Sequence, residues 1–108
     1  MQPTFQIEAR TGAPVIVIVI DASVARRNVT RWLGIHVADM LMADMPTLIL
    51  TSQPLRWRVP VVLGSSKGVV GEVGSVEVDA QTGELTTSPE LIKHLLAQAT
   101  CLVVARSH

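Results

Sequence analysis

The residues of this chain that could take part in catalysis or metal binding are few and scattered. Three histidines, His36, His94 and His108, are spread along the chain, and Cys101 is its single cysteine. Metal sites need ligands at close spacing, such as an H-x-x-x-H pair or paired cysteines, and the sequence has neither. The serines have no G-x-S-x-G context of the kind that marks a hydrolase nucleophile. We therefore predict no catalytic residue, no metal and no cofactor.

One carboxylate has a context that suggests chemistry. Asp21 follows the apolar run 15–20 and precedes Ala22-Ser23-Val24. Segment 17–24 resembles the opening of PIN-domain nucleases, in which an apolar strand ends in a metal-binding aspartate. The resemblance implies two-metal hydrolysis, which needs several converging carboxylates. The later carboxylates do not lie in the family's motifs, and Asp21 can equally be a helix N-cap. A nuclease centred on Asp21 is therefore an alternative function.

Basic and acidic residues are separated along the chain. Six of the nine basic residues precede residue 59, and five of the nine acidic residues lie between residues 72 and 90. The net charge is zero, which argues against nucleic-acid and membrane partners, because these attract a basic excess. The favoured interpretation pairs Arg56 and Arg58 with Glu72 or Glu77 across strands. The other interpretation is that the separated basic and acidic residues form a dipolar surface, which docks a partner or a second copy of the chain.

Length and composition predict one domain, covering residues 1–108, with an aliphatic core. Of the residues, 48% are hydrophobic, 17% charged and only 3% aromatic. We find no signal peptide at the start, and the run 15–20 is too short to span a bilayer. The expected location is the cytoplasm.

A long amphipathic helix is predicted from about Ala22 to about Ala43, after a central strand at residues 15–20 buried on both faces. Its inner face should carry these residues: Val29, Trp32, Leu33, His36, Val37 and Met40. Its outer face carries an apolar stripe at a coiled-coil-like spacing, formed by Val24, Ile35 and Met42. With Arg27 and Arg31 these are the candidate contact residues on the helix, and Arg56 and Arg58 form a second candidate surface.

Antiparallel strands are predicted for the second half of the chain. Apolar residues alternate over 55–63, with Pro60 indicating an edge strand or a bulge. The apolar parity changes at Gly74, which is typical of a β-bulge. Residues 79–83 form a hairpin turn, and Ser88-Pro89-Glu90 opens a last helix. Residues 101–105 could extend that helix or form a short strand.

The predicted fold is a single α+β domain of order β-β-α-β-β-β-(β)-α, with five to six mostly antiparallel strands and two helices on one face. Segment 22–85, with its Val76-Glu77-Val78-Asp79-Ala80-Gln81-Thr82-Gly83-Glu84-Leu85 signature, resembles the PepSY domain. That resemblance implies a non-catalytic module that inhibits or binds a partner. We expect a protein-interaction or regulatory module that binds a protein partner or itself, as a homo-oligomer. A third possibility is a small-ligand binder that uses the open sheet face with Arg56, Arg58 and Trp57.

Overall fold

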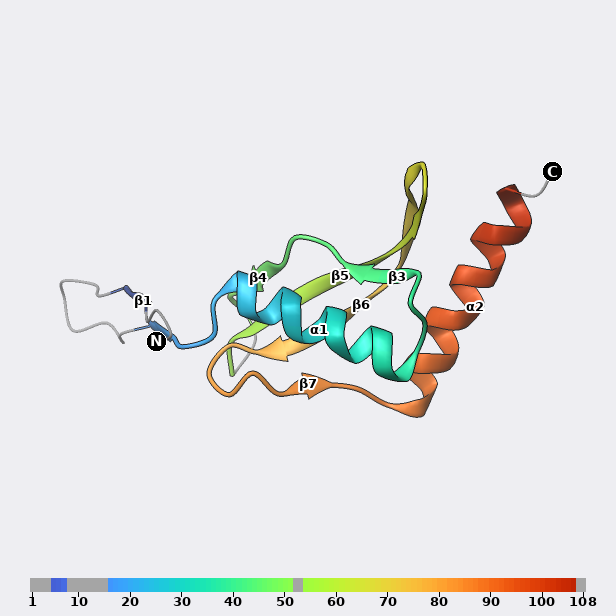
Figure 1. Ribbon diagram of the computed structural model, residues 1–108. Helices are drawn as coiled ribbons and strands as arrows, with labels where there is room; N and C mark the ends of the chain where they lie inside the picture. The colour runs from blue at the N-terminus through green and yellow to red at the C-terminus, as the bar shows by residue number, and fades with distance from the viewer. Residues whose placement is uncertain (1–4, 8–15, 52–53, 107–108) are drawn as a thin grey trace.

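The computed structural model describes residues 5–7, 16–51 and 54–106. These residues form a two-stranded sheet, a five-stranded antiparallel sheet and two helices (Figure 1). The elements in chain order are β1 (Phe5–Ile7), β2 (Ile16–Ile18), α1 (Ala22–His36), β3 (Leu41–Ala43), β4 (Thr47–Ile49), β5 (Arg56–Ser65), β6 (Gly68–Asp79), β7 (Leu85–Thr86) and α2 (Pro89–Arg106). The predicted α+β class is confirmed, and the element order holds with one added strand, β3.

The long β5–β6 hairpin is the centre of the larger sheet. β3 and β4 both pair with the outer edge of β5, and β7 pairs with β6. The register places Val59 opposite Val76 and Trp57 opposite Val78. Opposite residues of an antiparallel pair point to the same face. The two strands therefore share one apolar face.

Both helices cover that face, as predicted. Along α1, Ala25, Val29 and Leu33 recur every four residues and are fully buried. In α2, Leu95 is the fully buried residue of the same core cluster. Figure 1 shows α1 in front of the sheet and α2 at one end of it. The opposite sheet face is not covered by either helix.

The first helix is shorter than predicted, because it ends at His36 and not near Ala43. The amide N–H groups of Val37 and Ala38 both donate to the Leu33 carbonyl, which closes the last turn. Residues 41–43 then form β3, whose register with β5 places Met42 opposite Val62. Strand pairing overrides the helical periodicity here, since propensity is only a weak prior.

The apolar run at residues 15–20 is not a central strand, which corrects the prediction. Of its described residues, 16–20, the first three form the strand Ile16–Ile18, which pairs with β1 in a sheet separate from the main one. The chain reaches the main sheet just afterwards, where the N–H groups of Val19 and Ile20 donate to the Ala80 carbonyl at 3.1 and 2.8 Å. The Trp57 indole N–H also donates to the Ile20 carbonyl at 2.7 Å. These bonds fix the start of α1.

Pro60 does not mark an edge strand, because β5 has neighbours on both sides. Its carbonyl accepts from the Asp44 N–H at 2.8 Å, so its nitrogen faces the link between β3 and β4, where no strand residue pairs with it. The predicted bulge at Gly74 is confirmed. Gly74 lies opposite Val61 and Glu72 opposite Val62, which leaves Val73 as an extra residue in β6.

The turns and the last helix follow their sequence signals. The Asp79 carboxylate accepts from the N–H groups of Gln81 and Thr82, and Gly83 has a positive φ of 78°. The Ser88 hydroxyl accepts from the Leu91 N–H at 3.1 Å and caps α2, which begins at Pro89. Residues 101–105 continue the helix and do not form a strand.

Candidate protein-binding face on helix α1

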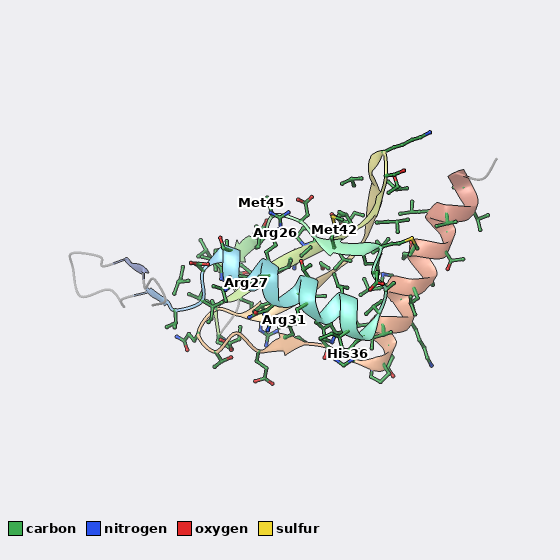
Figure 2. The ribbon with its side chains drawn as sticks, viewed as in Figure 1. Arg26, Arg27, Arg31, His36, Met42 and Met45 are labelled. Atoms are coloured by element: carbon green, nitrogen blue, oxygen red, sulfur yellow. The ribbon has the colours of Figure 1, made fainter. Side chains whose placement is uncertain are left out.

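The outer side of α1 has an unusual charge distribution. The helix contains three arginines, Arg26, Arg27 and Arg31, and no aspartate or glutamate. All three arginines are exposed. Figure 2 shows them along the solvent side of the helix, with Arg26 towards Met45. Because three positive charges lie on one helix that carries no acidic residue, the surface attracts anionic groups.

Arg26 is held in place by the strand beside it. Its Nε donates to the Ala43 carbonyl at 3.0 Å, and its Nη1 lies 3.9 Å from the Met45 sulfur. The side chain therefore lies against the end of β3. Its guanidinium still has N–H groups that no described residue accepts, because only one of its bonds reaches an oxygen.

Arg27 and Arg31 are different, since neither has a hydrogen-bond or ion-pair partner among the described residues. They are four residues apart, so their like charges face each other on the helix surface. Such a pair destabilises a helix by about 0.2–0.5 kcal/mol. The four-residue spacing of Arg27 and Arg31 therefore does not stabilise α1, and helix stability does not explain why both residues are arginine.

An apolar hollow lies next to Arg31, between α1 and the strand β7. Its volume is about 320 Å³ and its lining residues are Asn28, Arg31, Trp32, Ile35, His36, Leu85 and Thr87. The Trp32 and His36 rings are 6.2 Å apart at 37°. Ile35 is 68% exposed. Arg31 thus borders a partly aromatic depression.

Three of the five contact residues predicted on the helix come together here: Arg27, Arg31 and Ile35. The predicted stripe does not exist as such. Val24 is half-buried and packs against the core. Met42 is on β3, because the helix ends six residues before it. Met40, predicted on the inner face, is exposed beyond the helix.

The second predicted surface is already occupied within the chain. Arg56 and Arg58 lie on the open sheet face, with Nη1 of Arg56 3.1 Å and Nη2 of Arg58 3.8 Å from the Glu77 carboxylate. The predicted cross-strand pairing is confirmed for Glu77. Trp57 points to the covered face instead, where it bonds to the Ile20 carbonyl. It therefore adds nothing to the open face.

Some residues that line the hollow beside α1 could not be predicted from the sequence. His36 and Trp32 were assigned to the inner face, but His36 is exposed and Trp32 half-buried at the rim of the hollow. Leu85 and Thr87 join them through the β6–β7 pairing. No local sequence signal indicates that contact, because it depends on where β7 lies beside α1.

Asp21 acts as the N-cap of α1. Its Oδ1 accepts from the Val24 N–H at 2.9 Å. No group of three or more histidine, cysteine or acidic residues among the described residues is placed to hold a metal ion. Asp21 itself has the extended backbone of an N-cap residue.

Asp21→Ala should therefore lower the free energy of unfolding by about 1 kcal/mol, while Asp21→Asn should leave it nearly unchanged, because asparagine caps about as well. Urea unfolding of both variants measures this difference. An equal loss in both would contradict the capping role. For the nuclease alternative, the same Asp21→Asn protein should lose all metal-dependent nuclease activity.

In comparison with known proteins, no protein-family model, curated protein or solved structure matches this chain. Within the described residues, no helix combines the length and hydrophobicity needed to cross a membrane.

Proposed function

We propose that this protein is a non-catalytic binding module that presents the outer face of α1 to an acidic surface of a partner protein. The supporting observation is the exposed Arg27–Arg31 pair, which has no partner among the described residues, together with Ile35 and the hollow beside Arg31. In this proposal the two guanidinium groups bind carboxylates of the partner. An apolar side chain of the partner enters the hollow.

The composition of the face supports a protein partner. Arginine and aromatic residues are enriched in protein–protein interfaces, whereas lysine, aspartate and glutamate are depleted. The outer face of α1 has three arginines, the edge of Trp32 and no lysine or acid. Arginine also binds carboxylates through two parallel hydrogen bonds, which fixes the orientation of the partner.

A nucleic acid fits these observations less well. The chain has nine basic and nine acidic residues, so it lacks the basic excess that drives binding to phosphate backbones. An exposed isoleucine and an apolar hollow next to the arginines would gain little from a phosphate backbone.

We predict that the double variant Arg27→Glu/Arg31→Glu binds a poly-glutamate peptide about tenfold or more weakly than the wild type. Each exposed ion pair contributes ~0.2–1 kcal/mol, and the reversal turns attraction into repulsion. An amide NMR titration measures the affinity, and the largest shifts should lie on α1. Added salt should weaken the binding, because exposed charges are screened.

The matched control is Lys67→Glu/Lys93→Glu, which makes the same change in net charge at exposed residues outside α1. It should keep most of the affinity. Equal weakening in both double variants would show that only net charge matters and would contradict a binding face on α1. Tighter binding to a DNA duplex than to the peptide, lost in the arginine variant, would identify a nucleic-acid partner instead.

A further inference from the structure

The second half of α2 is an apolar helix surface without charge. From residue 96 to residue 105 the chain has no charged residue. Within this stretch Leu96, Val103 and Val104 remain 41%, 46% and 54% exposed. A helix that is apolar on all sides is normally buried on all sides. Among the described residues, nothing covers this part of the α2 surface completely.

The inner face of α2 is fully used by the sheet. A Cβ atom added to Gly74 would lie 2.9 Å from Leu95, and one added to Gly71 would lie 3.2 Å from Leu102. The helix thus approaches β6 closely through Leu95 and Leu102, which are seven residues apart. Leu96 lies on the neighbouring face of α2 and remains 41% exposed beside this contact.

That neighbouring face has the residue spacing of a helix–helix seam. We define the α2 seam as Ile92, Leu96, Ala99 and Val103. The steps between them are four, three and four residues, which average close to the 3.5-residue repeat of coiled coils. Ile92 and Ala99 are half-buried, while Leu96 and Val103 are exposed. Ala99, a small residue, lies near the middle of the seam.

A groove runs beside the α2 seam. It consists of two hollows of about 200 and 340 Å³ that share Met40, Leu63 and Val103. The smaller one is also lined by Leu96 and Ala99, and the larger one extends to the tip of the β5–β6 hairpin. The smaller hollow has no charged lining residue, and Lys67 is the one charged residue that lines the larger hollow, at the hairpin tip. The groove can therefore accept apolar side chains from a facing helix.

We propose that the α2 seam packs antiparallel against the α2 seam of a second copy of this chain. A two-fold axis between Ala99 and Thr100 places Leu96 of each copy opposite Val103 of the other. Leu96 and Val103 of each copy then enter the groove of the other copy. A two-fold contact of this kind uses the same surface on both partners, and the seam and its groove do lie on one surface.

Three observations favour a second copy over other occupants. The spacing of the α2 seam matches a helix, whereas a lipid or small ligand requires no such repeat. The stretch 96–105 has no charge, so an identical copy meets no like-charge repulsion there. The seam from Ile92 to Val103 spans ~17 Å along the helix. Met40 and the hairpin wall of the groove extend the apolar surface beyond the helix.

This self-association is independent of the proposed function, because it uses α2 and not α1. The two contacts should also respond oppositely to salt. Binding through Arg27 and Arg31 weakens as salt screens the charges, whereas an apolar contact does not. A negative result for binding through α1 therefore does not contradict self-association through α2, and the reverse also holds.

Light scattering on the full chain tests the proposal. The wild type should have the mass of a dimer at about 100 µM, since interfaces of this size reach micromolar affinity or better. Leu96→Glu should raise the dissociation constant about 100-fold, because it places a charge in an apolar contact. The matched control Val104→Glu introduces the same charge on the same helix outside the seam and should remain a dimer. Thermal unfolding checks that both variants are folded.

A cross-link gives an independent test that does not depend on a destabilising change. In a Cys101→Ser background, Thr100→Cys lies next to the two-fold axis and should form a disulfide-linked dimer on mild oxidation. Gln98→Cys in the same background lies off the seam and should cross-link much more slowly. A wild-type monomer at all concentrations, equal cross-linking of the two cysteines, or a dimer that Leu96→Glu leaves intact would overturn the proposal.

Discussion

Leu95→Ala should lower the free energy of unfolding by about 2–5 kcal/mol, the range measured for large-to-small changes in protein cores. Leu95 is 0% exposed and is the residue through which α2 joins the core cluster. Its Cδ2 atom also lies against Gly74, which has no side chain to fill the space that the alanine leaves. We expect the loss to come with detachment of α2 from the sheet.

Urea unfolding followed by circular dichroism measures this effect, and thermal unfolding should show a drop of about 4–8 °C per kcal/mol. Val104→Ala is the matched control, because it also shortens an aliphatic side chain of α2, but one that is 54% exposed. It should change the stability by no more than about 0.5 kcal/mol. A similar small effect of Leu95→Ala would show that α2 does not pack as described.

Gly74→Val should destabilise the protein by about 1–3 kcal/mol, the usual cost of overpacking a core. The first atom of any side chain at Gly74 would lie 2.9 Å from the Cδ2 atom of Leu95 and 3.5 Å from the His94 ring. Leu95 cannot move away freely, since it is completely buried. The added side chain must therefore push α2 away from β6.

Gly34→Ala is the contrasting control for that variant. Gly34 is in the interior of α1, and a Cβ atom there would have nothing within 4 Å. Alanine favours a helix interior over glycine by about 0.8–1.0 kcal/mol, so this substitution should stabilise the protein. Urea unfolding of both variants measures the change in the free energy of unfolding. This change should be negative for Gly74→Val and positive for Gly34→Ala. Stabilisation by Gly74→Val would contradict the close approach of α2 to β6.

Local chemistry explains the parts of the fold that were predictable from the sequence. The Asp21 cap, the bulge at Gly74, the turn ending in Gly83 and the Ser88 cap each depend on a few neighbouring residues. These signals act within a turn or a strand pair, so their outcome does not require knowledge of the whole chain. The α+β class followed from the order of such elements.

The errors arose where distant contacts decide the structure. No proline or glycine separates residues 37–43 from the helix, and the end of α1 at His36 is set by the pairing of β3 with β5. The run 15–20 is apolar enough for a central strand, but it pairs only with β1. Periodicity describes what a segment can bury and not what it pairs with.

The candidate site was partly predictable for the same reason. Arg27, Arg31 and Ile35 lie on one side of a helix whose existence was clear from the sequence, so their common exposure followed from helical geometry. Met42 was misplaced because the helix length was wrong. The hollow between α1 and β7 depends on tertiary packing, and no residue pattern indicates it.

The central proposal is that α1 presents a binding face to acidic protein surfaces. Its most direct test is the affinity for poly-glutamate of Arg27→Glu/Arg31→Glu, compared with that of Lys67→Glu/Lys93→Glu at the same salt concentration. We predict a loss of about tenfold or more for the arginine variant and little loss for the lysine variant. Equal affinities of the two variants would contradict the claim.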